Sequence, residues 1–285
     1  MGVRGVEALL AVVMAARGSS FIFSKLLLEE IGSFTVLALR FGIAFLLLCV
    51  IFWRRLWRAS GRVWLAGAIV GLAYFVVMSL EMTALSMADT GPVALVEHTA
   101  IVMVPLATAM LARRKPDPLW LGAGALTTFG VGLLTVPGGH ISAGLIVALG
   151  GAVAYTVTII ITDRLTPDTE SGLAIGIIQL GVLGVLAGVT ALWFESPALP
   201  TGGTQWAMMA MLVIVCTAFG FTLQPVAQAR VCAERTGLLA ALNPAVASVL
   251  GAVVLGERFN WLGGLGFVLV LIGITLPYLI KNSRS

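Results

Sequence analysis

Apolar residues follow one another in long runs along the whole chain, and short polar turns separate the runs. A helix needs about 20 mainly apolar residues to cross the hydrocarbon of a bilayer. The pattern therefore predicts an all-α integral membrane protein with ten transmembrane helices. We place them near residues 6–24, 33–53, 63–86, 91–112, 118–136, 142–162, 171–194, 205–228, 237–255 and 261–280.

The second half of this pattern repeats the first half weakly. Lys25 and Arg40 stand 15 residues apart, and the same spacing separates Arg164 from Gln179. Five spans in each half put an odd number between equivalent positions, so the two halves must be inverted relative to each other. Inverted repeats around a site near the middle of the membrane are a recurrent transporter design. We predict two five-helix repeats, residues 1–137 and 138–285, around a central cavity.

The composition excludes a soluble domain. Apolar residues make up 59% of the chain, charged residues 11%, and the mean hydropathy is +1.06. Soluble domains carry about 45–50% apolar and about 25% charged residues. The polar stretch Met1–Glu7 is too short for a leader before an apolar core, and no cleavage site follows the first run. We interpret that run as a retained helix.

The positive charges predict the orientation of the chain. Two arginines lie inside spans, and only Lys25 and Arg258 fall on one side of the predicted bilayer. Positively charged residues gather in cytoplasmic loops. We therefore expect both termini in the cytoplasm of a cell whose inner membrane holds the protein. The cytoplasmic side would then carry Arg4, Arg54, Arg55, Arg58, Arg62, Arg113, Arg114, Lys115, Arg164, Arg230, Arg235, Lys281 and Arg284.

This charge pattern and the absent motifs limit the functional classes. The basic excess, with a pI near 9.3, is a topology signal and not a nucleic-acid surface. Cys49, Cys216 and Cys232 lie far apart and predict neither a disulfide framework nor a metal site. The sequence has no nucleotide-binding glycine loop and no hydrolase or metalloprotease motif. We expect no cofactor and no enzymatic activity.

Two groups of motifs resemble a known family. The first is Gly18-Ser19-Ser20-Phe21-Ile22-Phe23-Ser24-Lys25, followed by Phe34-Thr35 and Ala38-Leu39-Arg40-Phe41. The second is Asn243-Pro244, Leu255-Gly256-Glu257-Arg258, Gly263 and Gly273. Their order and spacing resemble the EamA branch of the drug/metabolite transporter superfamily over nearly the whole chain.

This resemblance implies ten helices in two inverted repeats, a central cavity and transport of amino acids or other small metabolites, often outward. The chain departs from the family pattern in two places. Arg17 stands where the family commonly has tryptophan, before Gly-Ser-Ser. The first repeat ends in Arg113-Arg114-Lys115-Pro116, whereas the family often has a Gly-Glu pair like Gly256-Glu257.

Ionisable residues within the predicted spans are the strongest candidates for a site. They are Arg17, Arg40, Glu81, Glu97 and His98. A charge at the centre of a bilayer costs about 2.5–3.5 kcal/mol on insertion scales, so such residues face the protein interior and find partners. Two arginines and two glutamates suit internal pairing. All five lie in the first repeat, which predicts a cavity with most of its charge on one side.

We predict that Glu81, Glu97 and His98 form a substrate or proton site, with Arg17 or Arg40 as counter-ion. Histidine titrates near neutral pH, so protons remain an open alternative as coupling ion. Arg40 matches a general feature of the family, which favours a structural role. Glu81 has an alternative to a role in the site, because it could lie near the helix end, at the membrane interface. Glu97 and His98 are adjacent and cannot share one face of a continuous helix, so we expect one of them to face the cavity while the other pairs with a neighbouring helix.

Neutral residues complete the predicted site. Asn243 offers polar groups from the second repeat, and Pro105, Pro225 and Pro244 are candidate kinks or gating points. Proline frees a carbonyl inside a helix, although a passive bend is the simpler interpretation. Three aromatic residues are candidates for the cavity wall, with ordinary packing as their alternative: Tyr74, Tyr155 and Phe219.

The leading hypothesis is a secondary transporter that exports an amino acid or a related metabolite by alternating access. The rival is a transporter of organic cations such as quaternary ammonium compounds, because buried carboxylates suit them. A membrane enzyme or a structural subunit fits less well, since the loops are short and such subunits rarely need buried charges. A duplicated repeat supplies internal symmetry, so we expect a monomer, with a homodimer as the alternative.

Overall fold

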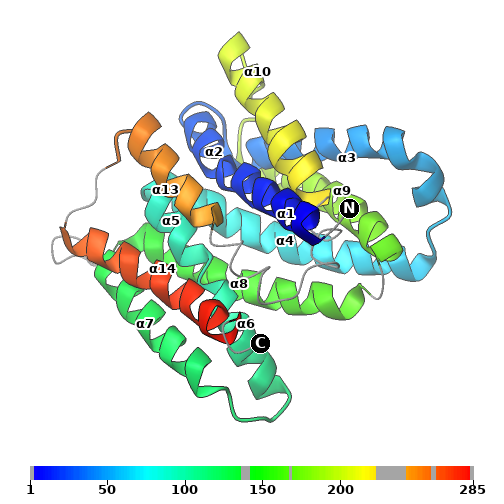
Figure 1. Cartoon of the computed structure of the whole chain (residues 1–285). Coiled ribbons are helices and arrows are strands. Elements are labelled where there is room, and N and C mark those ends of the chain that lie inside the picture. Colours follow the sequence, from blue (N-terminus) through cyan, green and yellow to red (C-terminus); the bar gives the residue numbers. More distant parts are fainter. Residues whose placement is uncertain (1–2, 136–141, 167–168, 223–241, 258–260, 283–285) are drawn as a thin grey trace.

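The protein is a bundle of helices (Figure 1). A computed structural model describes residues 3–135, 142–166, 169–222, 242–257 and 261–282. No strand occurs in these ranges. The helices are α1 (Val3–Gly18), α2 (Ser20–Leu28), α3 (Ser33–Trp57), α4 (Gly61–Met87), α5 (Thr90–Glu97), α6 (Ala100–Leu111), α7 (Pro118–Thr135), α8 (Ala143–Leu165), α9 (Thr169–Phe194), α10 (Gly203–Ala210), the π-helix η2 (Met211–Phe219), α13 (Leu242–Val254) and α14 (Trp261–Asn282).

Most of these helices are built for a bilayer. Within the described ranges, seven spans are long and apolar enough to cross a membrane, and three shorter apolar helices accompany them. The short ones are Pro118–Val131, Leu242–Val254 and Trp261–Pro277. Each predicted apolar run coincides with a helix or helix pair, although the eighth run is described only as far as Thr222 and the ninth only from Leu242 onward. The prediction of an all-α, multi-pass chain is therefore confirmed.

Two of the predicted spans are broken helices. The first run divides into α1 and α2 around Ser19, and the fourth divides into α5 and α6 around His98 and Thr99. At the second break the Val96 carbonyl accepts hydrogen bonds from both the backbone N–H of Thr99, at 3.1 Å, and the Thr99 hydroxyl, at 2.7 Å. The sequence pattern predicted continuous helices at both places, because hydropathy does not register an interruption of one or two residues.

Long helices pack in pairs around these breaks. Helix α3 lies along α9, α4 contacts both α8 and α9, and α14 lies beside α7 at one edge of the bundle (Figure 1). Helix α13 packs against α1 and α5. The broken helices are thus held between long continuous ones, which positions their interrupted ends inside the bundle.

Glycine sets the closest of these helix contacts. A Cβ atom on Gly184 of α9 would lie 2.8 Å from the backbone nitrogen of Gly42 on α3. A Cβ atom on Gly71 of α4 would lie 2.9 Å from the Gln179 carbonyl oxygen of α9. Small residues allow membrane helices to approach at backbone distance. A Cβ atom on Gly176 would meet nothing within 4 Å, so that residue does not share this role.

Gly184→Ala should destabilise the protein. The added methyl group meets backbone atoms that cannot rotate away, and such overpacking costs about 1–3 kcal/mol. We expect a lower melting temperature in detergent, measured by fluorescence-detected size-exclusion chromatography. Gly188→Ala, one turn further along the same helix, is the control, because its nearest neighbour would be Ala38 Cβ at 3.8 Å. Equal stability of the two variants would contradict backbone-distance packing of α3 and α9.

Candidate functional site

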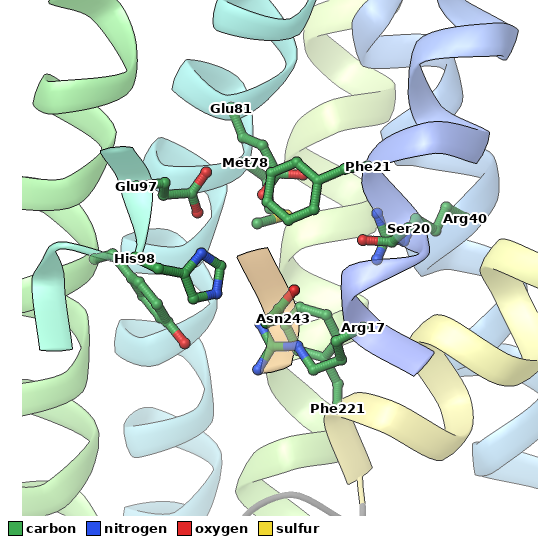
Figure 2. A pocket seen from close by; sticks show the side chains of 11 residues that line it. Arg17, Ser20, Phe21, Arg40, Met78, Glu81, Glu97, His98, Phe221 and Asn243 are labelled. Atoms are coloured by element: carbon green, nitrogen blue, oxygen red, sulfur yellow. The ribbon is translucent and has the colours of Figure 1, made fainter. Parts of the chain in front are cut away.

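A small enclosed cavity lies among the helix breaks (Figure 2). Its space for water-sized probes is about 10 Å³, which is room for about one water molecule. The lining includes two arginines, two glutamates and a histidine around one space. The full lining is Arg17, Ser20, Phe21, Arg40, Met78, Glu81, Glu97, His98, Tyr155, Phe221 and Asn243.

The breaks bring these residues together. Arg17 is in the last turn of α1, Ser20 and Phe21 open α2, and Glu97 and His98 end α5. Asn243 lies in the first turn of α13. A Cβ atom on Gly18 would lie 2.5 Å from the Asn243 carbonyl oxygen. Glycine at position 18 therefore allows the α1–α2 break to touch the start of α13.

Arg17 lies flat against an aromatic ring. Its Cζ atom is 4.1 Å from the centroid of Phe221, and the side chain is 7% exposed. A guanidinium over an aromatic face gains cation–π attraction, more so where water is excluded. Its aliphatic stem passes Gly220, where a Cβ atom would come within 2.9 Å of Arg17 Cγ. Gly220 and Phe221 thus hold the Arg17 side chain inside the bundle: Gly220 leaves room for its stem, and the Phe221 ring contacts its guanidinium group.

Arg40 also lies near Phe221 and is held by a hydrogen bond. Its Nε donates a hydrogen bond to Thr217 Oγ1 at 2.7 Å, and its Cζ lies 4.9 Å from the Phe41 centroid and 5.9 Å from the Phe221 centroid. The side chain is 1% exposed. Its Nη1 atom has no hydrogen-bond partner among the described residues. Arg40 therefore combines a structural anchor with a donor that faces the cavity.

Glu81 and Glu97 form a carboxyl pair. Each is 3% exposed, and the two side chains are within hydrogen-bonding reach of each other. A hydrogen bond between two carboxyl groups requires a proton on one of them. The charges of Arg17 and Arg40 both act on Glu81. Among the described residues neither glutamate forms an ion pair with Arg40, so the direct pairing that the sequence suggested there is not found.

Aromatic and imidazole rings enclose the carboxyl pair. His98 Nδ1 lies 2.8 Å from the Ala94 carbonyl oxygen. A carbonyl only accepts, so Nδ1 carries the hydrogen and Nε2 is left as an acceptor. The His98 ring lies 6.1 Å from the centroids of Phe21 and Tyr155. Tyr74 is not part of the cavity lining. Its ring makes an edge-to-face contact with the ring of Phe221, and the two centroids are 5.7 Å apart.

Four buried polar atoms around the cavity have no hydrogen-bond partner among the described residues. They are Arg40 Nη1, Glu81 Oε1, Glu97 Oε2 and Asn243 Oδ1. Buried polar atoms are nearly always paired, so each exception calls for an explanation. One donor faces three acceptors across this space. The arrangement is suited to a small ligand with both an anionic and a cationic group.

The structure places most of the predicted residues in one site. Arg17, Arg40, Glu81, Glu97, His98, Asn243 and Tyr155 line the cavity, and Tyr74 supports it. The prediction that only one of Glu97 and His98 faces the cavity is wrong, because the helix ends between them and the turn redirects the chain. Phe219, a candidate for the cavity wall, is not part of the lining, whereas Phe221 is.

The predicted prolines are not at the helix breaks. Pro105 lies within α6, which continues through it. Pro244 lies in α13, which the structure describes from Leu242 onward. Pro225 lies outside the described residues. Neither described proline lines the cavity, so any gating role for them would act at a distance.

Four cavity residues were not predicted from the sequence: Ser20, Phe21, Met78 and Phe221. Ser20 and Phe21 belong to the Gly-Ser-Ser-Phe motif, whose position beside Arg17 was a usable signal. Met78 and Phe221 are apolar residues in apolar helices, and nothing in their local sequence distinguishes them from lipid-facing neighbours. Only the three-dimensional contact with the arginines identifies Phe221.

Two charged side chains cap helix ends near Thr90, at the opposite end of α5 from Glu97. Glu257, which follows α13, accepts hydrogen bonds from the backbone N–H groups of Thr90 at 2.6 Å and Gly91 at 3.1 Å. It therefore caps the N-terminus of α5, where the helix dipole favours an anion. Lys25 Nζ donates to the carbonyls of Leu85 at 2.9 Å and Ala88 at 2.6 Å, at the end of α4. We call these two contacts the Glu257 cap and the Lys25 cap.

Asp89 lies between the two caps. Partial burial and the nearby charge of Glu257 raise the pKa of Asp89, and Lys25 lowers it in part. The negative charge on Asp89 therefore works against the Glu257 cap. This end of the bundle is the end at which α4 finishes, opposite the arginines at its start.

The sequence can now be compared with known proteins. A family model described as the EamA-like transporter family matches the chain twice, over residues 5–136 and 142–279. The chain belongs to the EamA-like transporter family. With its long apolar helices, this membership makes it a multi-pass membrane transporter rather than an enzyme, within the drug/metabolite transporter superfamily.

Relatives of this EamA-like chain include named exporters. It is 28% identical to the threonine/homoserine exporter RhtA of Escherichia coli K12, over 88% of this chain and 84% of that protein. The RhtA protein of Salmonella typhimurium LT2 is also 28% identical, over 88% of this chain and 83% of its own length. An uncharacterised transporter of Archaeoglobus fulgidus is 22% identical, with coverage of 94% and 95%.

One solved structure has the same fold. A crystal structure superposes with a TM-score of 0.68 at 18% identity and covers 98% of this chain and 97% of that one. At this identity the similarity concerns the fold alone.

Thr217→Val should weaken the folded state by about 1.5–3 kcal/mol, the usual value of a hydrogen bond to a charged group. The change keeps the shape of residue 217 but removes the acceptor of Arg40 Nε. Thermal unfolding in detergent measures it. Thr158→Val is the matched control, because the buried Thr158 hydroxyl donates only to Ala154 of its own helix. A Thr217→Val variant no less stable than the control would mean that Arg40 does not depend on this bond.

Proposed function

We propose that this protein is a secondary transporter that exports a zwitterionic amino acid, with threonine and homoserine as the leading substrates. The main support for this proposal is the cavity, in which buried guanidinium and carboxyl groups line one small space. The named function of the RhtA relatives supports the substrate class. Neither argument depends on the other.

The polar groups divide into two sets that match the two ends of an amino acid. Arg17 and Arg40 Nη1 are donors suited to a carboxylate, which accepts charge-assisted hydrogen bonds from guanidinium groups. Glu81 Oε1, Glu97 Oε2 and Asn243 Oδ1 are acceptors suited to an ammonium group. An amino acid would pair each set with its opposite charge.

Organic cations, the rival substrate class, fit this lining less well. The carboxyl pair and the rings of Phe21 and Tyr155 suit a cation. Two arginines in the same small lining disfavour a cationic ligand. Such a ligand would come close to both guanidinium groups and has no anionic group of its own to pair with them. The presence of Arg17 therefore favours a zwitterion.

Transport would proceed by alternating access. A cavity of about 10 Å³ is too small for an amino acid, so the described conformation is closed around the site and helices must separate to load it. The Glu257 cap joins α13 to α5, and both helices carry cavity residues. We assign this cap to the gate at that end of the bundle.

Two inverted five-helix repeats, residues 1–137 and 138–285, would supply the two halves that move. The double match of the family model supports this division. Corresponding helices α6 and α13 also end alike, because Arg113 and Gly256 both have positive φ, 51° and 67°. Arg113 thus adopts the backbone turn that the glycine of the family's Gly-Glu pair would provide.

The arginine-rich face would be cytoplasmic, which follows the usual distribution of positive charge. Both termini would then lie in the cytoplasm, with the protein in the cytoplasmic membrane. The Glu257 and Lys25 caps would close the outer side. The internal duplication favours a monomer as the working unit.

Neutralising either charge set should reduce amino-acid transport. In proteoliposomes loaded with labelled threonine, we expect Arg17→Gln and Glu97→Gln each to lower counterflow at least tenfold, because each leaves one end of the zwitterion without its partner. Glu97→Gln should also abolish any transport of a quaternary ammonium compound.

Thr156→Val is the control for this experiment, since its buried hydroxyl bonds only to Ala152 within α8. Wild-type threonine counterflow in both glutamine variants would show that the cavity is not the substrate site. Loss of cation transport with full threonine transport in Glu97→Gln would instead identify two independent substrates.

Glu257→Gln should open the closed end. A neutral amide is a weaker cap for α5 than a carboxylate. Its effect is measured by the rate at which an impermeant maleimide modifies Ser20→Cys, in a chain whose three native cysteines are replaced. We expect a several-fold faster reaction than with Glu257 intact.

Glu195→Gln is the matched control. Glu195 also caps a helix, because it accepts from the N–H groups of Phe34 and Thr35, both at 2.9 Å, at the start of α3. It joins no pair of broken-helix ends at the cavity. If both variants expose residue 20 equally, the cap is a general stabiliser and not a gate.

A further inference from the structure

A second cavity lies at the other end of α4, away from the substrate site. It has a volume of about 580 Å³. Its polar lining is Arg54, Arg55 and Arg58 from the end of α3, Ser60 before α4, and Ser171 from α9, and its apolar lining is Ala59, Val63 and Ala174. We call it the basic cleft.

The three arginines are not occupied with carboxylates. Among the described residues none of Arg54, Arg55 and Arg58 forms an ion pair, and Arg54 stacks on Trp53 with its Cζ 5.5 Å from the ring centroid. No acidic residue belongs to the described lining. Three fixed positive charges around one cleft attract an anion, and guanidinium groups suit a phosphate in particular, which they can bind with two parallel hydrogen bonds.

The start of α4 adds to this field. Ser60 is the N-cap residue, and its side chain makes no capping hydrogen bond. The positive end of the helix dipole therefore points into a cleft already lined by arginines, and helix N-termini readily bind phosphate. The α4 helix is 27 residues long, so this terminus is a fully formed one.

Exposed tryptophans are neighbours of the cleft residues in sequence. Trp53, Trp57 and Trp64 are 58%, 86% and 44% exposed. Exposed tryptophans mark the interface between hydrocarbon and water in membrane proteins. Val63 and Ala174 give the same cleft an apolar wall that a glycerol backbone or acyl chain can cover.

We propose that the basic cleft binds the phosphate group of an anionic phospholipid. A bound head group would join the turn between α3 and α4 to the first turns of α9, which lie more than 100 residues further along the chain. Basic pockets between helices on the positively charged side of a membrane protein are suited to anionic lipid. The cleft is separate from the substrate cavity, so the proposal holds whatever the transported molecule is.

Native mass spectrometry of the purified full-length protein tests it, with phosphatidylglycerol and phosphatidylcholine in equal amounts. We expect the wild type to retain phosphatidylglycerol preferentially. The variant Arg54→Gln/Arg55→Gln/Arg58→Gln should retain at least about tenfold less, a modest loss for three guanidinium contacts. The matched control, Arg113→Gln/Arg114→Gln/Lys115→Gln, removes three charges outside the cleft and should retain the lipid as the wild type does.

A second variant separates the cleft from its charge. Ala59→Trp fills the cleft and keeps all three arginines, so it should also lose phosphatidylglycerol. Excess inorganic phosphate should not displace the lipid, because it lacks the apolar part that Val63 and Ala174 contact. Equal lipid retention in the two triple variants, or full retention in Ala59→Trp, would overturn the proposal. Displacement by inorganic phosphate would do the same and identify a free anion as the ligand.

Discussion

The structure is organised by the cost of holding charges where water does not reach. Arg17, Arg40, Glu81 and Glu97 are all buried within helices apolar enough for a bilayer. Lipid chains cannot form hydrogen bonds with such groups, so these side chains must point inward and find hydrogen bonds or aromatic faces there. Thr217 and Phe221 meet this requirement for the arginines, and the two glutamates meet it partly through each other. The polar atoms that stay without a hydrogen-bond partner among the described residues, such as Arg40 Nη1 and Glu97 Oε2, mark the candidate site.

Broken helices resolve the geometric side of the same constraint. A continuous helix presents adjacent residues to different faces, but the end of α5 presents Glu97 and His98 to one cavity. The break after α1 similarly exposes Arg17 beside Ser20. Interrupted helices are a common way to place polar groups at mid-membrane depth. Glycines 18 and 220 make the arrangement possible, because any side chain there would collide with Asn243 or Arg17.

The sequence was sufficient for the helices and for the charged part of the site. Apolar runs locate helices well because bilayer length is a strict requirement, and a charge inside such a run stands out. The breaks at Ser19 and at His98–Thr99 and the partner Phe221 were beyond its reach. An interruption of one or two residues leaves the hydropathy of a span unchanged. Phe221 matters because its ring contacts Arg17 of α1 and Arg40 of α3, and both helices are distant from it in sequence. The substitution of Arg17 for the usual family tryptophan was the most informative single residue, because it changes the charge of the cavity.

The most direct test of the account varies the ligand and leaves the protein intact. Thermal stabilisation and calorimetric binding would be measured for threonine, threonine methyl ester and N-acetylthreonine, which remove the negative and the positive charge of the amino acid in turn. The account predicts that threonine binds and that both derivatives bind at least about tenfold more weakly, since each leaves buried charges unpaired. Equal binding of the methyl ester would contradict a cavity built around Arg17 and the carboxyl pair of Glu81 and Glu97.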